Sequence, residues 1–454
     1  MQWRSLRDSA RARASIRNAL YGAMEYIVLP LTMLLATPFL LHHLGIVQFG
    51  LWVLASAAVT SSNLISTGFG DGALKYASMY RGKADASRFE HTVRVNVTIN
   101  LGLGGILASV LWFGSPLAVR SIFKIVPTLQ SDAVTAFRIG SAILIVRCIE
   151  SVLTGALRAH ERYAPAVQIS IVSRAAIVIV ACAVVWQGHG IVTIMSATLC
   201  VVAFSVLVQA VAVRILIARI WPLPSFDRLA FADVFRFGCF SWLQAFAGCV
   251  FNQADRLVVG ALLGTPAVGY YSVCVQAAQP IHGLIAAALH FLFPHLSARL
   301  STASAAELRG VVMSIVRLNA LMAAVMCIPM VLFSNVILRL WMGAAFAAHA
   351  WIALSIIALS FGLLSLNVSA HYALLALAQV RLVATLNLLG GAAMLISMLL
   401  LAPRLGLPGA AAARLLYGPI TLFMYPRLRR LLSPSALNTH TELGQLIVSG
   451  TEAR

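Results

Sequence analysis

Charged residues are scarce in this sequence. Only 10% of its 454 residues are charged, 60% are hydrophobic, and the mean hydropathy is +0.90. Because about a quarter of the residues in a soluble domain are charged, this composition excludes an ordinary soluble protein. Apolar runs longer than about 18 residues recur along the chain, as membrane-spanning helices require. The alternating segments of about ten residues that predict a transmembrane β-barrel do not occur.

Sequence patterns of catalytic and metal sites are also missing. No glycine-rich loop carries the Lys and Ser or Thr of a nucleotide-binding motif, so we expect no built-in ATPase. The 14 acidic residues are scattered and do not pair for acid–base catalysis. The seven cysteines lie in apolar runs without metal-ligand spacing, which indicates small buried side chains. We therefore expect a protein that is not an enzyme and that binds no metal or cofactor.

The N-terminal segment does not have the pattern of a cleavable signal peptide. Its first 17 residues include five arginines. The apolar run that follows is too long for the core of a signal peptide, and it lacks a clear small-residue cleavage site. We expect this run to be the first membrane-spanning helix.

The apolar runs predict an all-α polytopic membrane protein with about 12 membrane-spanning helices. A cytoplasmic linker at 218–235 divides the chain into two lobes of six helices. We expect the lobes at 1–217 and 236–430, followed by a cytoplasmic tail at 431–454. The expected spans are 19–42, 49–72, 93–114, 133–157, 165–186, 190–213, 236–262, 267–293, 311–333, 350–376, 381–402 and 406–426.

Basic residues concentrate in alternate loops. Clusters occur before the first span, in the even-numbered loops and in the tail, whereas the odd-numbered loops hold few. Since basic loops stay on the cytoplasmic side, we expect both termini in the cytoplasm. The same pattern accounts for the net charge of +19 without a nucleic-acid partner. The basic residues of the odd-numbered loops are Arg120, Lys124, Arg339 and Arg404.

A short segment of the chain occurs twice. Residues 44–52 and 263–271 both contain Leu-Gly, a second Gly five residues after the first, and then an aromatic residue. The copies are 219 residues apart, and at this offset Arg17 aligns with Arg236. We interpret the segments as tight turns in an internal duplication. Because each lobe has an even number of helices, the lobes are expected to be parallel repeats, as in some secondary transporters.

We single out eight of the charged residues that fall inside the expected spans, where lipid disfavours them. An Arg at the bilayer centre costs roughly 2.5–3.5 kcal/mol, so such residues usually face the bundle interior or a wet cavity. Five of the eight are cationic, which predicts a net basic interior. The eight are Glu25, Arg138, Arg147, Glu150, Arg174, Asp255, Arg256 and Arg414.

Helix geometry distinguishes two kinds of intramembrane charge. Arg147 and Glu150 are three residues apart and share a helix face, so we expect them to pair. Arg174, Arg256 and Arg414 have no acidic residue within a turn on a shared face. We expect these three to line a cavity, because the guanidinium group can bind phosphate oxygens in a bidentate way. The alternative is that the charges only hold helices together.

Weaker polar signals lie in the second half of the chain. Gln276, Gln279 and His282 cluster beside Pro280, where they could contact a sugar or satisfy the backbone carbonyl that a proline kink leaves unbonded.

The second copy of the duplicated segment differs from the first, because Asp255 and Arg256 precede its turn and have no charged counterpart in the first half. The turns are duplicated and the charges are not.

Twelve expected helices in two halves, with the Leu-Gly segment after the first helix of each half, resemble the polysaccharide flippases of the multidrug/oligosaccharidyl-lipid/polysaccharide (MOP) exporter superfamily. The resemblance covers about residues 15–430, and the ordered recurrence of loose motifs carries it. It implies a MATE-like fold. The residues are Leu44-Gly45, Gly50, Trp52 and Thr67-Gly68-Phe69-Gly70 in the first half, and Asp255-Arg256, Gly260, Leu263-Gly264, Gly269 and Tyr270 in the second.

The resemblance also implies a function. Proteins of this kind move undecaprenyl-pyrophosphate-linked oligosaccharide units, for O-antigen or exopolysaccharide, across the bacterial inner membrane by alternating access coupled to an ion gradient. It implies substrate-binding roles for Arg147, Arg174, Arg256 and Arg414 at the pyrophosphate. The candidates for ion coupling are Asp255, which we rank first because it lacks an obvious local partner, then Glu25 and Glu150. A polysaccharide polymerase and the chain-length machinery are expected partners.

Three other functions remain open. A drug or metabolite exporter of the same superfamily binds organic cations, and a net basic interior argues against it. A membrane-embedded polysaccharide polymerase or ligase typically carries a large outer loop, but the longest outer loop here, at about 115–132, has fewer than about 20 residues. A non-transporting scaffold would have no use for intramembrane arginines.

Overall fold

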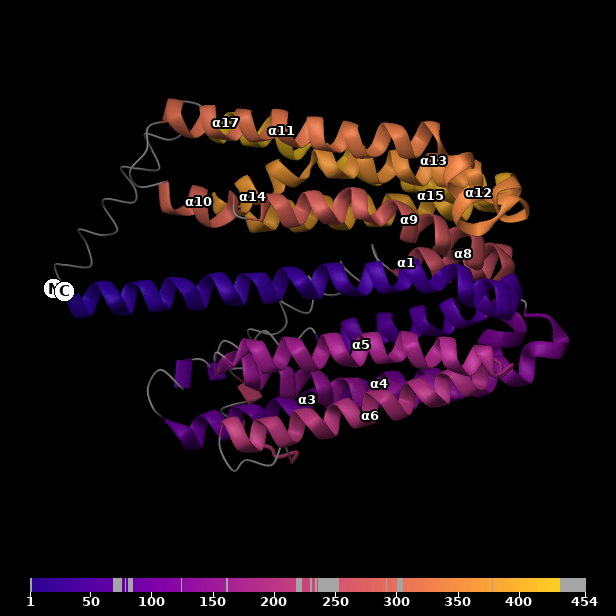
Figure 1. The fold of residues 1–454 in the computed structure, drawn as a ribbon, viewed down its shortest axis with the longest axis horizontal. Coiled ribbons are helices and arrows are strands. Elements are labelled where there is room, and N and C mark those ends of the chain that lie inside the picture. The colour runs from indigo at the N-terminus through magenta and orange to yellow at the C-terminus, as the bar shows by residue number, and fades with distance from the viewer. Residues whose placement is uncertain are drawn as a thin grey trace. The chain divides into compact units, whose positions relative to one another are not determined.

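The computed structural model describes thirteen segments of the chain. For 2–29, 63–67, 86, 294, 298 and 305 it describes the helical backbone but not the surroundings of the side chains. The described residues are 2–67, 76–77, 79–80, 85–123, 125–160, 162–217, 223–228, 231–232, 235, 253–290, 292–299, 305–377 and 379–432. Within these residues the chain is helical and contains no strand, which confirms the predicted all-α class (Figure 1).

The contacts divide the chain into two compact units, Met1–Ser272 and Val273–Arg454. This division falls after the predicted linker at 218–235, inside helix α9. Residues 236–252, where the predicted second lobe begins, lie outside the described part of the chain, as do nearly all of the predicted tail residues. The predicted lobes at 1–217 and 236–430 therefore stay a prediction.

The first unit holds eight of the elements and the start of a ninth, α9 (Thr265–Leu289). Its helices α3 to α6 run alongside one another (Figure 1). The eight are α1 (Gln2–Thr67), α3 (Ala86–Leu117), the π-helix η1 (Ala118–Ile122), the 3-10 helix η2 (Pro127–Leu129), α4 (Gln130–Ala159), α5 (Tyr163–Trp186), α6 (Ile191–Leu216) and α8 (Asp255–Leu263).

The second unit begins within α9. Its remaining elements are α10 (Leu292–Arg299), α11 (Ala305–Leu332), α12 (Ser334–Met342), α13 (Ala344–Leu366), α14 (Val368–Ala376), α15 (Val380–Arg414), α16 (Tyr417–Leu422) and α17 (Met424–Leu431).

Nine helices in the described residues are long and apolar enough to cross a membrane. Two of them contain a break, at Gly45 in α1 and at Gly406 in α15, so each covers two predicted spans. Eleven predicted spans overlap the nine helices, and the remaining one, 236–262, overlaps α8. The protein is therefore a polytopic helical membrane protein, as predicted.

Each unit has an apolar core and an apolar outer face. In the first unit, α4 packs against α3 and α6, and its Leu144 and Leu153 are completely buried. In the second unit, α13 packs against α11 and α15. Large apolar side chains such as Phe113, Ile215 and Leu340 are exposed. Exposure of so much apolar surface suits a protein whose outer face contacts lipid.

The two copies of the duplicated segment have the same backbone geometry at their first glycine. Gly45 has φ 71° and ψ 165°, and Gly264 has φ 81° and ψ 178°. A positive φ is readily adopted only by glycine, so each Leu-Gly sequence ends one helix and begins the next. The predicted breaks at both places are confirmed.

The duplicated turns also pack against each other within the first unit. A Cβ atom added to Gly50 would overlap the carbonyl oxygen of Thr265. A Cβ added to Gly269 would lie 2.6 Å from Cδ1 and 3.1 Å from the carbonyl oxygen of Ile46. Gly50 and Gly269 are 219 residues apart, and so are Ile46 and Thr265. The contact is therefore reciprocal: each copy presses its second glycine against the start of the other copy's second helix.

Candidate functional site

The first group of polar residues lies between α4 and α6. Arg147 and Glu150 project from one face of α4, and Nη1 of Arg147 donates a hydrogen bond of 2.6 Å to Oε2 of Glu150. This confirms the ion pair predicted from their spacing of three residues. The Arg147 side chain is 23% exposed and that of Glu150 is 10% exposed, so the carboxylate lies deeper than the guanidinium.

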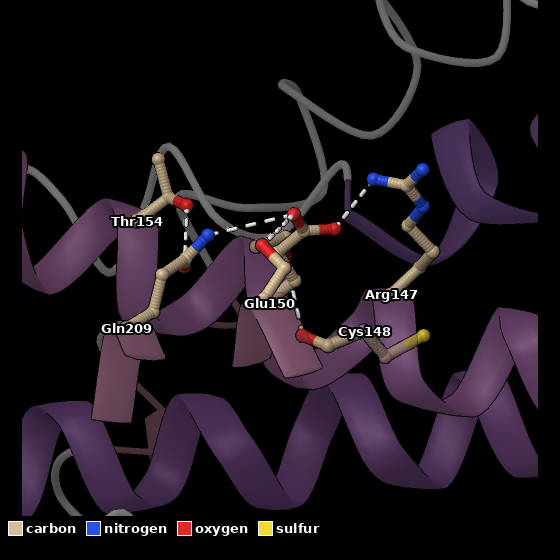
Figure 2. A network of polar contacts seen from close by, with 7 residues as sticks. Arg147, Cys148, Glu150, Thr154 and Gln209 are labelled. Atoms are coloured by element: carbon tan, nitrogen blue, oxygen red, sulfur yellow. Dashed lines mark hydrogen bonds and ion pairs between the residues drawn. The ribbon is translucent and has the colours of Figure 1, made fainter. Parts of the chain in front are cut away.

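Helix α6 supplies the other partners of the Glu150 carboxylate. Ser205 Oγ and Gln209 Nε2 each donate to Oε1 over 3.4 Å. The amide oxygen of Gln209 accepts a hydrogen bond of 3.0 Å from Thr154 of α4, which orients the amide. Figure 2 shows the carboxylate between the Arg147 guanidinium and the Gln209 amide. The network therefore satisfies a buried charge and ties two helices together.

Gln209, Thr154 and Ser205 were not predicted as site residues. Gln209 is the strongest signal that the sequence offered, because it is the one polar residue in the apolar run 206–213, and the structure buries it completely. A single amide in such a run usually has a partner on another helix. The sequence does not say which helix provides that partner.

The second group surrounds Asp255 at the start of α8. Asp255 is 1% exposed, and its Oδ2 accepts a hydrogen bond of 2.9 Å from the Tyr271 hydroxyl of α9. Its Oδ1 accepts 2.8 Å from the backbone N–H of Arg256. The Arg256 guanidinium donates 2.9 Å to Gln253 Oε1. The expectation that Asp255 lacks a local partner is therefore wrong, because Tyr271 reaches it across the turn at Gly264.

Removing the Tyr271 hydroxyl is expected to destabilise the protein. Tyr271→Phe leaves one oxygen of a buried carboxylate without this donor, which typically costs about 1–3 kcal/mol. The thermal unfolding midpoint of the purified protein measures the loss. Tyr163→Phe is the control, because no hydrogen bond of the half-buried Tyr163 hydroxyl occurs among the described residues. Equal midpoints for the two variants would show that the Tyr271 bond contributes nothing.

The third group lies in the second unit, around Arg414 at the end of α15. Arg414 is 3% exposed, and its guanidinium lies 4.6 Å from the centre of the Phe361 ring. Its backbone carbonyl accepts a hydrogen bond of 3.0 Å from Ser360 Oγ. His282 of α9 interacts electrostatically with Arg414 and with His371 of α14. Four helices thus contribute to one buried basic group.

The second unit has very little negative charge to balance this group. Between residues 273 and 432 the sequence contains a single carboxylate, Glu307. Glu307 is exposed in the first turn of α11. The interior of this unit is therefore basic, as predicted for the protein as a whole.

The remaining predicted residues lie elsewhere. Arg174 is half-buried in α5. Arg138 is half-buried in α4, with its guanidinium 5.3 Å from the centre of the Trp112 ring. Glu25 belongs to α1, but its side chain lies outside the described residues. Across the described segments, no group of three or more His, Cys, Asp or Glu could hold a metal ion.

Solved structures with a similar fold are transporters of the MOP superfamily. An inward-facing multidrug resistance MATE family transporter aligns with a TM-score of 0.71 at 15% identity, over 92% of this chain and 99% of its own. The lipid II flippase MurJ in its inward closed conformation aligns with a TM-score of 0.69 at 13% identity, over 96% of this chain and 90% of its own. A MOP superfamily transporter from Pyrococcus furiosus aligns with a TM-score of 0.56 at 14% identity, over 94% of this chain and 96% of its own.

The protein therefore has the fold of these transporters. The sequence pattern of a family described as polysaccharide biosynthesis protein matches residues 48–351. The chain belongs to this family. A comparison with curated proteins gave no match. These findings agree with the predicted polysaccharide family and confirm the predicted MATE-like fold.

Proposed function

We propose that the protein is a flippase for undecaprenyl-pyrophosphate-linked oligosaccharide units in the bacterial inner membrane. It moves the lipid-linked sugar from the inner to the outer leaflet by alternating access, and both of its termini lie in the cytoplasm. One observation carries the proposal. All four arginines predicted to bind the substrate are partly or fully buried in apolar helices of a polysaccharide biosynthesis protein.

The substrate chemistry explains why arginines suit this role. A pyrophosphate group carries several anionic oxygens, and the planar guanidinium binds two such oxygens at once. A guanidinium is more weakly hydrated than an ammonium, so a phosphate that binds it gains a strong interaction. Arg147, Arg174, Arg256 and Arg414 are the residues that we assign to this contact.

Ion coupling is the part of the proposal that needs a carboxylate. Glu150 and Asp255 are both buried, and both accept hydrogen bonds from more than one donor. Glu25 is the third candidate. A proton or a sodium ion that binds one of these carboxylates would neutralise its charge inside the membrane. Because a charge in the membrane carries a large free-energy cost, this neutralisation could drive a conformational change.

Deletion of the gene tests the function directly. The deletion strain is expected to accumulate an undecaprenyl-pyrophosphate-linked oligosaccharide on the cytoplasmic leaflet and to lose surface polysaccharide. Extraction and mass spectrometry of lipid-linked sugars measure the first effect, and staining of surface polysaccharide measures the second. Re-expression of the wild-type chain should reverse both. A deletion strain with normal surface polysaccharide and no accumulated intermediate would overturn the proposal.

The same experiment separates the other functions. A polymerase or ligase acts after translocation, so its loss would leave the intermediate on the outer leaflet. A drug exporter would change resistance to organic cations and leave the polysaccharide unchanged. The polymerase and chain-length machinery would act on the product on the outer side, and we expect them to be the partners of the protein.

A further inference from the structure

The Arg147 guanidinium is only partly used by its partner. Nη1 binds Glu150, and Arg147 has no other hydrogen bond or ion pair with the residues that the structure describes. Its side chain is 23% exposed, so the unused N–H groups are accessible. Glu150, by contrast, is held from the other side by Ser205 and Gln209. The acid is fixed in the core, and the base at its edge can take a second partner.

We propose that Glu150 competes with the phosphate of the substrate for Arg147, and that a proton on Glu150 decides the competition. This inference rests on the proposed function, because it concerns the contact of Arg147 with the pyrophosphate. While Glu150 is ionised, it holds the guanidinium. When its Oε2 takes up a proton, the group becomes neutral and the ion pair is lost. Arg147 then offers its full fork of donors to two phosphate oxygens.

The surroundings of Glu150 accommodate both protonation states. The two hydrogen bonds from α6 end on Oε1, whereas the ion pair ends on Oε2. A proton on Oε2 therefore leaves Oε1 free to accept from Ser205 and Gln209 as before. The Gln209 amide is also oriented by Thr154 and does not depend on Arg147. Departure of Arg147 therefore leaves the hydrogen bonds of Oε1 intact and requires only that the new Oε2–H finds another acceptor.

Among the described residues, no other ionisable group binds Glu150 in place of Arg147. Helices α1, α3, α5 and α6 and the short elements η1 and η2 all pack against α4. In the segments that the structure describes, none of their charged or histidine side chains makes a hydrogen bond or ion pair with Glu150. On α3, Glu90 pairs with Arg94 at 2.8 Å. The described charged and histidine side chains of these elements are His42, His43, Arg88, Glu90, His91, Arg94, Arg120, Arg174 and Arg214.

Binding of undecaprenyl pyrophosphate to the purified full-length protein tests the inference at pH 5.5 to 8. Wild-type affinity is expected to rise as the pH falls, by a factor within the range of about 5- to 150-fold that is typical of coupled sites. Glu150→Gln should bind tightly at every pH, because its neutral amide never holds Arg147. Arg147→Gln should bind weakly at every pH. Asp132→Asn, which neutralises an exposed carboxylate in the first turn of α4, should behave like the wild type.

Two results would overturn the inference, and they differ in what else they remove. If Glu150→Gln keeps the pH dependence of the wild type, the proton acts elsewhere, although binding itself still supports the proposed function. If the wild type does not bind undecaprenyl pyrophosphate at any pH, the proposed function fails as well. Should Glu150→Gln not fold, the Arg147→Gln variant decides: a pH dependence equal to that of the wild type would exclude the competition.

Discussion

Replacement of Arg414 by alanine is expected to abolish complementation of the deletion strain. Arg414 is 3% exposed in the basic interior of the second unit, so the proposed alternating access would have to separate the surrounding helices before a substrate could reach it. A hydrogen bond to a charged group is worth about 1.5–3 kcal/mol. Its loss weakens binding roughly ten- to hundredfold, because each 1.4 kcal/mol is about a factor of ten. Surface polysaccharide and the pool of lipid-linked intermediate measure the effect.

Two further variants separate binding from folding. Arg404→Ala removes an exposed arginine of the same helix and should complement fully. Arg414→Lys keeps the charge and loses the planar fork, so it should transport poorly while it remains in the membrane at normal amounts. If Arg414→Ala complements fully at normal protein levels, the guanidinium has no role in transport. If Arg414→Lys also complements fully, the bidentate contact is not needed.

Much of the fold follows from local features of the sequence. A spanning helix is defined by its own apolar length, so the predicted spans match the helices without knowledge of their neighbours. The breaks at Gly45 and Gly264 were predictable for a similar reason, since Leu-Gly recurs with the same spacing and only glycine readily adopts the required φ. The Arg147–Glu150 pair is also local, because both residues belong to one turn of one helix.

Contacts between helices are what the sequence did not reveal. Asp255 and Tyr271 are 16 residues apart and lie on different helices, so neither residue identifies the other. The same is true of Glu150 and Gln209, which are 59 residues apart. Helical spacing predicts which residues share a face, but it does not predict which face of another helix they meet. The site was therefore predicted as a set of charges and lacked its polar partners.

Loss of the reciprocal glycine contact is expected to have the largest effect on stability. Gly50→Ala places a methyl group on the carbonyl oxygen of Thr265, and a backbone atom cannot move aside without shifting its helix. Overpacking of this kind costs about 1–3 kcal/mol, and sometimes more. The thermal unfolding midpoint and the amount of protein in the membrane should both fall. Gly102→Ala is the matched control, because Gly102 is exposed in α3 and no atom lies within 4 Å of an added Cβ.

Gly269→Ala tests whether the contact is between backbones. Its added methyl group meets mainly the end of the Ile46 side chain, which can rotate away, so the loss should be smaller than for Gly50→Ala. Shortening that side chain with Ile46→Ala should relieve Gly269→Ala in the double variant, and it should leave the Gly50→Ala defect unchanged. Because residues in contact are not additive, the double variant measures this coupling directly. If Gly50→Ala and Gly102→Ala unfold at the same temperature, the duplicated turns do not touch in the folded protein.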